Sequence, residues 1–181
     1  MFEAKLRPPH IQLLEQGVID ISGEVNLELA LHARECLLHL TSRGSPDVKL
    51  LITSTGGDVE YGLDIYDAFR LYAGKKTGMV HGVAASMAAI ILQACTERVA
   101  AANAYLLIHH ISRRNVSLDE LRSDKKIARI RGELEASQQR QYEILSQRTG
   151  RTIRSIRAAC ARNQRMSAQQ ALDFGLIDKI V

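Results

Sequence analysis

The chain has 181 residues, of which 46% are hydrophobic and 24% are charged, and this is typical of one soluble globular domain with a full core. Aromatic residues make up only 4% and Trp is absent, so Leu, Ile, Val and Ala must fill that core. The net charge is +4, and the single aromatic residue between Arg113 and Arg165 is Tyr142. Because nucleic-acid platforms combine a basic patch with several aromatic residues, the composition argues against a nucleic-acid partner.

Neither a membrane anchor nor a metal site is evident in the sequence. No apolar run approaches the about 18 residues of a transmembrane helix, and the first residues lack the basic and then apolar pattern of a signal peptide. Cys36, Cys95 and Cys160 are odd in number and widely spaced, without the close Cys or His pairs of a metal site. We therefore expect buried free thiols in a cytoplasmic protein that has no membrane contact, no metal and no cofactor.

The first half of the chain alternates strand and helix patterns. Pro8 and Pro9 predict an irregular start over residues 1–16. After it we expect a strand over 18–23, an amphipathic helix over 27–41, a turn over 43–46, a strand over 48–53, a loop over 54–57 and a helix over 59–72.

The second half continues this alternation and adds one long polar helix. Alternating strands and helices without an internal repeat or linker predict a single α/β domain with a mainly parallel sheet flanked by helices. The long helix carries so much charge that we expect it to project from the domain or to pack against another subunit. The expected elements are strands over 77–80, 98–101 and 105–108, a helix from 85 to just before Thr96, the long helix over 117–149 with Gly132 as a site for a kink, and helices over 153–162 and 167–174.

Ser86 lies at the junction between the strand over 77–80 and the following helix. A Ser at such a junction has free backbone N–H groups beside it and the positive end of the helix dipole beneath it. This is a favourable place for a nucleophilic hydroxyl. A lone Ser there is also typical of a helix N-cap or of a small residue at a tight helix contact.

Acyl transfer by Ser86 needs a base and donors for the oxyanion. The best candidate for the base is His109, at the end of an apolar strand, whereas the adjacent His110 points to the opposite face. Oxyanion donors could come from the Met87 N–H and from the Gly56–Gly57 pair, since paired glycines allow close backbone approach. Each of these residues also has an ordinary structural explanation as a turn glycine or a strand-end histidine.

Several ordered motifs, taken together, resemble the proteolytic subunit family of Clp proteases. The ending from Met166 to Lys179 also matches the closing helix and strand of that family, so the resemblance covers roughly residues 18–181. The motifs are Ser54-Thr55-Gly56-Gly57, Gly62 with Ile65-Tyr66-Asp67, Gly82-Val83-Ala84-Ala85-Ser86-Met87-Ala88-Ala89, and Leu107-Ile108-His109.

The resemblance implies a crotonase-like fold, a superhelix of ββα units, and serine peptidase activity on unfolded proteins and peptides. It implies a homo-oligomeric ring, a heptamer or a stacked tetradecamer that encloses the active sites, and an AAA+ unfoldase or a paralogous subunit as partner. It divides the domain into an N-terminal segment over 1–17, a head over 18–110 and 150–181, and a handle over 111–149.

The resemblance also implies roles for individual residues. Ser86 is the expected nucleophile, His109 the expected base, and the backbone N–H groups of Gly57 and Met87 the expected oxyanion hole. The segment after Gly57 is expected to bind the substrate backbone as an added strand. The residues expected to bind substrate are Gly56, Asp58 and Val59.

The chain departs from the family pattern at several positions, three of which bear on function. Asn163 stands where the family has the Asp of its triad; its amide oxygen can accept the imidazole N–H but cannot balance the imidazolium charge. Such an exchange can lower kcat by about 10⁴. The residues after His109, His110-Ile111-Ser112, begin an altered handle. Lys49, Leu51, Leu71 and Val99 occupy positions that are aromatic in the family's unfoldase-docking pocket.

Three functions follow as alternatives. The first is a serine endopeptidase with Ser86, His109 and Asn163 as its triad. The second is a catalytically weak or silent ring subunit that needs an active paralogue. The third is an acyl-CoA enzyme on the same fold, which the Ser-Met run and the position of His109 argue against.

Overall fold

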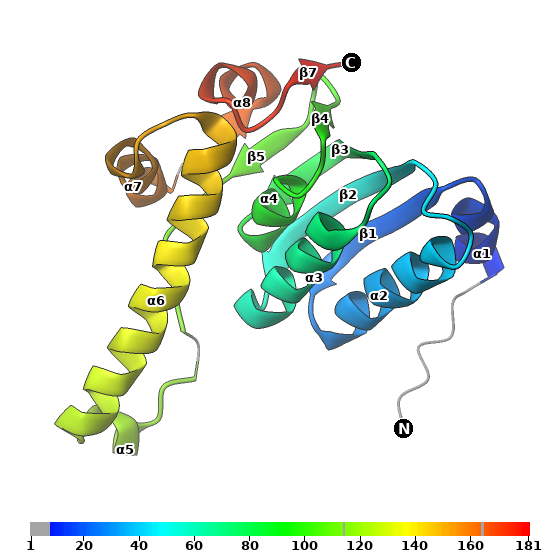
Figure 1. The fold of residues 1–181 in the computed structure, drawn as a ribbon. Helices are drawn as coiled ribbons and strands as arrows, with labels where there is room; N and C mark the ends of the chain where they lie inside the picture. The colour runs from blue at the N-terminus through cyan, green and yellow to red at the C-terminus, as the bar shows by residue number, and fades with distance from the viewer. Residues whose placement is uncertain (1–7, 114, 164) are drawn as a thin grey trace.

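A computed structural model describes residues 8–113, 115–163 and 165–181, and its centre is a largely parallel β-sheet (Figure 1). The strands of the described residues follow the order β1-β2-β3-β4-β7, and β5 pairs with β3 and with β6. All of these pairs are parallel except β5 with β6. The predicted α/β fold with a mainly parallel sheet is confirmed. The strands are β1 (Val18–Val25), β2 (Val48–Gly57), β3 (Lys76–Ala85), β4 (Glu97–Ala100), β5 (Tyr105–Leu107), β6 (Met166–Ser167) and β7 (Lys179–Ile180).

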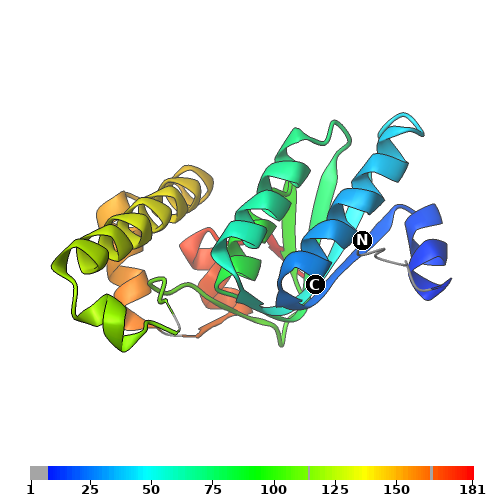
Figure 2. The ribbon, with the colours of Figure 1, turned by 90° about the horizontal axis from the view of Figure 1, so that it is seen from below.

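Helices pack against one face of the sheet and extend away from one end of it. Figures 1 and 2 show α2 and α3 side by side on the same face, while α4 contacts α3, β2 and β3. Along β2 the side chains alternate between buried and more exposed, so this strand has one face in the core. The helices are α1 (Pro8–Glu15), α2 (Leu27–Thr41), α3 (Val59–Leu71), α4 (Met87–Leu92), α5 (Leu118–Leu121), α6 (Asp124–Thr149), α7 (Ile153–Arg162) and α8 (Ala168–Phe174).

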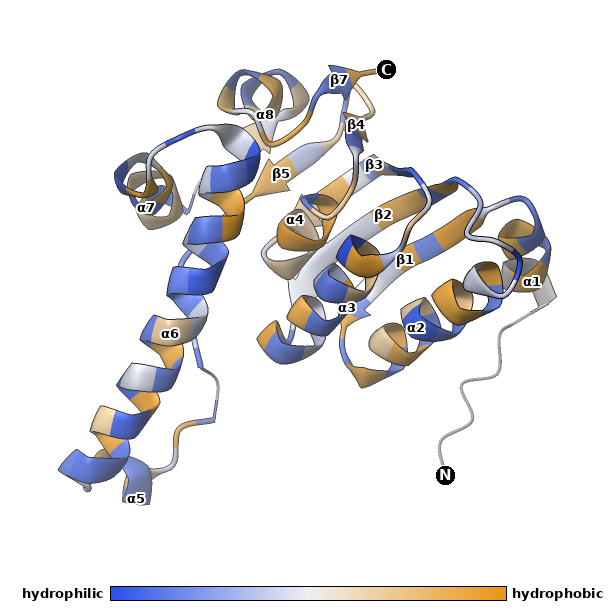
Figure 3. Cartoon of the chain, viewed as in Figure 1, coloured by the Kyte–Doolittle hydropathy of each residue, from blue (hydrophilic) through white to orange (hydrophobic). Residues whose placement is uncertain are grey.

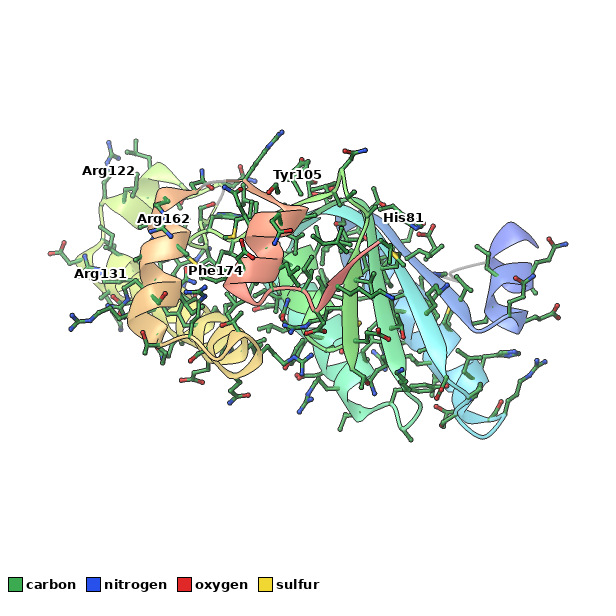
Figure 4. The ribbon with its side chains drawn as sticks, turned by 90° about the horizontal axis from the view of Figure 1, so that it is seen from above. His81, Tyr105, Arg122, Arg131, Arg162 and Phe174 are labelled. Atoms are coloured by element: carbon green, nitrogen blue, oxygen red, sulfur yellow. The ribbon has the colours of Figure 1, made fainter. Side chains whose placement is uncertain are left out.

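The arm formed by α5, α6 and α7 projects from the sheet. Figure 3 colours much of α6 as hydrophilic, and Figure 4 shows Arg122, Arg131 and Arg162 on this arm, away from His81 at the sheet. The C-terminal half of α6 is nevertheless anchored, because Tyr142 and Leu145 are part of the hydrophobic core. The predicted long helix therefore projects at one end and is buried at the other.

The prediction of a single helix over 117–149 is wrong, because two separate N-caps divide it. Ser117 forms a capping box with Glu120 and begins α5, and Ser123 accepts a hydrogen bond from the Lys126 N–H to begin α6. α6 then runs through Gly132 without interruption.

The prediction of an irregular start over residues 1–16 is also wrong for its second half. α1 begins at Pro8, and a proline in the first helical turn is tolerated because the N–H that it lacks would have no helical partner there. Residues 1–7 lie outside the described residues. The three cysteines are free and buried, as expected.

A buried polar network fastens the C-terminal segment to the sheet. The Arg98 guanidinium, from β4, donates hydrogen bonds to Asp178, to Gln93 Oε1 at 2.6 Å and to the Gly175 carbonyl at 2.8 Å. Burial alone would raise the Asp178 pKa, but the hydrogen bonds and the charge of Arg98 outweigh it, so that pKa lies below its ordinary value.

Candidate active site

Ser86 lies between the end of β3 and the start of α4 in a strained backbone conformation, with φ 56° and ψ −125°. A non-glycine residue in such a region costs of order 1–3 kcal/mol and persists only where its surroundings hold it in place. Here the β3–β5 pairing holds it: Ala85 is opposite Leu107, and the Ser86 N–H donates to the Leu107 carbonyl at 2.9 Å. Ser86 occupies the N-cap position of α4, but its side chain makes no capping hydrogen bond.

Gly56 approaches Ser86 more closely than any other residue type could. A Cβ placed on Gly56 would lie 2.6 Å from Ser86 Cβ, 2.7 Å from the Ala85 carbonyl oxygen and 2.9 Å from the Met87 nitrogen. Its φ of +90° also favours glycine. The backbone at the end of β2 therefore lies directly against the residue predicted to be the nucleophile.

The Met87 N–H is one of the two predicted donors to the oxyanion. Met87 is the first residue of α4, so its N–H has no acceptor within the helix. No hydrogen bond from this N–H is found to any residue that the structure describes. Gly57, on β2, pairs with Val25, and a Cβ on it would lie 2.3 Å from the Val25 carbonyl oxygen. Whether the two N–H groups act together on an oxyanion stays a prediction.

His109 lies two residues after the end of β5 and is half-buried, whereas the adjacent His110 is exposed. The Ser86 N–H bonds to Leu107, only two residues before His109, so the predicted nucleophile and base lie at neighbouring strand ends. Within the described residues no hydrogen bond joins the Ser86 and His109 side chains. Catalytic hydrogen bonds are often long before substrate binds, so this does not exclude the pair.

Asn163 is the C-cap of α7 and is exposed, with φ 47° and ψ 37°. Its N–H donates to the Cys160 carbonyl at 3.1 Å. Asn is one of the few residues that adopts this left-handed conformation readily, so its position has a structural explanation. In the described part of the chain its side chain makes no hydrogen bond to His109, and its catalytic role stays a prediction.

Asp58 is the N-cap of α3, a role typical of an Asp directly before a helix. Its carboxylate caps α3 by accepting hydrogen bonds from the N–H groups of Glu60 at 2.8 Å and Tyr61 at 3.1 Å. Its own N–H donates to the Val25 carbonyl, and Val59 is already the first residue of α3. The substrate-binding roles of Gly56, Asp58 and Val59 stay predictions.

Two glutamines on α6 contact the segments that carry the candidate catalytic residues. The Gln141 amide nitrogen lies 3.3 Å from Met87 Sδ, and Gln141 is buried. The Gln138 amide oxygen accepts a hydrogen bond from the Ile111 N–H at 2.7 Å. Neither contact was predicted from the sequence. The only available signal was the recurrence of Gln three residues apart on one helix.

Across residues 8–113, 115–163 and 165–181, no three His, Cys, Asp or Glu side chains are grouped so that they could hold a metal ion. No described helix is both long enough and apolar enough to cross a bilayer.

Two comparisons with known proteins show which family the chain resembles. A sequence profile described as Clp protease matches residues 5–181. A relative from Ligilactobacillus salivarius (strain UCC118), named ATP-dependent Clp protease proteolytic subunit, is 33% identical over 174 residues, which cover 94% of this chain and 85% of the relative.

Proposed function

This chain belongs to the Clp protease family, and we propose that it is a serine-type endopeptidase subunit that cleaves unfolded proteins and peptides inside an oligomeric ring. The observation that carries the proposal is the position of Ser86. Its strained backbone is bonded to Leu107, two residues from His109, and Gly56 lies against it.

In the proposed mechanism Ser86 Oγ attacks the scissile carbonyl while His109 takes its proton and later delivers it to the leaving amine. The N–H groups of Gly57 and Met87 stabilise the negative charge on the carbonyl oxygen. The Asn163 amide oxygen holds the imidazole in the tautomer that can accept the Ser proton. Water then attacks the acyl group on Ser86 and releases the second product.

The proposed assembly is a homo-oligomeric ring with an AAA+ unfoldase or a paralogous subunit as partner. The name of the relative, which includes ATP-dependent, supports an energy-consuming partner. The projecting arm of α5, α6 and α7 offers a surface for contact between copies (Figure 1). Three free thiols fit a reducing compartment, so we place the assembly in the cytoplasm.

The test of catalysis is intact-mass analysis after treatment with a fluorophosphonate. A single adduct that disappears in Ser86→Ala and in His109→Ala supports an activated serine. A folded wild-type protein that forms no adduct refutes the peptidase.

A silent ring subunit is the second candidate, and the residue at position 163 favours it. Asn163→Asp and Asn163→Gly separate the two roles of Asn163, because both replacements tolerate the left-handed backbone but only Asp offers a carboxylate. If Asn163 acts on His109, Asp speeds the reaction of Ser86 and Gly slows it. Equal rates in all three proteins assign Asn163 to capping alone.

A further inference from the structure

The segment around α7 concentrates positive charge without compensating acidic residues. Residues 144–172 include six arginines, no lysine and no Asp or Glu. Two of these arginines are bound to backbone carbonyls, since Arg148 donates to Cys95 at 2.7 Å and Arg151 donates to Phe174 at 2.8 Å. The other four are exposed and form no ion pair with a described residue; they are Arg154, Arg157, Arg162 and Arg165.

Strand pairing brings the end of this basic segment close to Ser86. β5 and β6 are antiparallel, and Arg165 directly precedes β6, so it comes beside Leu107 at the end of β5. The Leu107 carbonyl is the acceptor for the Ser86 N–H. The Arg165 guanidinium lies 4.3 Å from the centre of the ring of Tyr105, a partly exposed residue of β5. α7 ends at Arg162, only three residues before Arg165.

The acidic residues next to the site lie on the other side of Ser86. The sheet order places β1 and β6 on opposite sides of β3, the strand that ends directly before Ser86. Glu24, on β1, is opposite Gly56, and the Asp58 carboxylate is already bound to the N–H groups that it caps. The charge across the site is therefore polarised, with the positive side at α7 and β6.

We propose that the site selects acidic segments of unfolded proteins, and that Asp or Glu side chains of a bound segment lie against Arg162 and Arg165. A guanidinium binds a carboxylate through parallel N–H donors, and neither arginine has to give up an internal ion pair with a described residue to do so. An excess of one charge beside a site also raises the local concentration of ligands of the opposite charge. This inference rests on the proposed function of Ser86 and names a substrate class for it.

The test measures how well short peptides protect Ser86 from a fluorophosphonate, with intact mass as the readout, so turnover is not needed. The peptides share one uncharged sequence of about ten residues that carries an adjacent pair of Glu, Gln or Lys. The pair stands near the N-terminus in one set and near the C-terminus in the other, which covers both directions of the peptide chain. We expect one Glu peptide to protect at a roughly three- to ten-fold lower concentration than its Gln counterpart, the range of one or two exposed ion pairs.

The Lys counterpart should protect least. Raising the ionic strength from about 0.05 M to about 0.5 M shortens the Debye length from more than 10 Å to less than 8 Å and should bring the Glu and Gln peptides together. A preference that is based on the shape of the side chain would survive the added salt.

Variants of the two arginines separate charge from shape. In the double variant Arg162→Gln, Arg165→Gln the Glu and Gln peptides should protect equally, whereas Arg162→Lys with Arg165→Lys should keep most of the preference. The matched control is Arg34→Gln with Arg43→Gln, which removes two charges from α2 and from the turn after it, at the opposite end of the molecule from α7 (Figure 1). The control should keep the wild-type ratio. Peptides are compared within one protein, so a change in the intrinsic reactivity of Ser86 cancels.

The two proposals fail in different ways. No Ser86 adduct with the fluorophosphonate refutes the peptidase and this inference with it. An adduct against which the Glu and Gln peptides protect equally refutes the inference alone, and so does an equal loss of preference in the control, because net charge would then be the cause. A double Gln variant that keeps the preference but changes the mass of the assembly assigns the two arginines to a subunit contact and also refutes the inference.

Discussion

Replacing Gly56 by Ala tests whether close backbone approach positions Ser86. The new Cβ would lie 2.6 Å from Ser86 Cβ and 2.9 Å from the Met87 nitrogen, so the strand end or the nucleophile must move. The φ of +90° costs an L-residue about 1–2 kcal/mol, and the forced contacts add about 1–3 kcal/mol. We expect the free energy of unfolding to fall by about 2–5 kcal/mol. A displacement of the nucleophile by about 1 Å can slow its reaction by about 10².

Gly23→Ala is the matched control for this variant. Gly23 has φ +91°, nearly the value at Gly56, but a Cβ on it would meet nothing within 4 Å. The free energy of unfolding of Gly23→Ala should therefore fall only by the backbone strain, about 1–2 kcal/mol. The rate of Ser86 labelling should stay at the wild-type value. Chemical denaturation gives the stability of both variants, and fluorophosphonate labelling gives the reactivity of Ser86. A Gly56→Ala protein that labels at the wild-type rate would refute the reasoning.

Three further predictions concern stability and thiol reactivity. The Asp178 pKa is lowered on folding, so the ionised carboxylate stabilises the protein at neutral pH, and this contribution is lost as the pH falls below about 4. In Asp178→Asn the free energy of unfolding, measured by urea titration, should therefore fall less between neutral and acid pH than in the wild type. Breaking a fully buried ion pair costs about 3–5 kcal/mol. At neutral pH Asp178→Asn should cost less than this, because the Asp178 side chain is 39% exposed. Burial raises the pKa of Cys36 and of Cys95 to about 12 and that of Cys160 to about 11, so a thiol reagent at pH 8 should modify none of them until denaturant is added. Gly132→Ala should raise the free energy of unfolding by about 0.5–1 kcal/mol, because Gly132 is helical and no atom lies within 4 Å of the new Cβ. An unchanged or lower free energy of unfolding would contradict this.

The sequence predicted most reliably the elements that carry their own local signals. α2 was placed correctly, and the structure shows its N-cap, Asn26, accepting the Leu29 N–H. The end of β2 was missed because Gly56 and Gly57 have the composition of a loop. Their strand character comes from pairing with β1, which reaches Gly57 opposite Val25. Such pairing is a property of the assembled sheet and leaves no local pattern in either segment.

The sequence predicted which strand and helix ends carry the candidate site residues, but not the side-chain contacts that these residues make. Ser86 and His109 do lie at neighbouring strand ends, as the strand and helix pattern required. The contact of Gln141 with Met87 depends on where α6 meets α4, and the contact of Gln138 with Ile111 depends on where α6 meets the segment after β5. No local pattern in the sequence of α6 marks either position. The close approach of Gly62 to the Met87 side chain has the same origin, because it depends on the packing of α3 against α4.

The strained conformation of Ser86 is flanked on both sides by buried apolar residues. A residue in a sparsely populated conformation relaxes unless the structure on both sides prevents it. Here Ala84 and Ala85 before it, and every residue of α4 after it, are buried, while Ser86 itself is partly exposed. Relaxation of Ser86 would have to move β3 or α4 within the packed core, where even small shifts are costly. The hydrophobic core thus holds the candidate nucleophile in position, so variants that loosen α4 should reduce Ser86 reactivity before they unfold the protein.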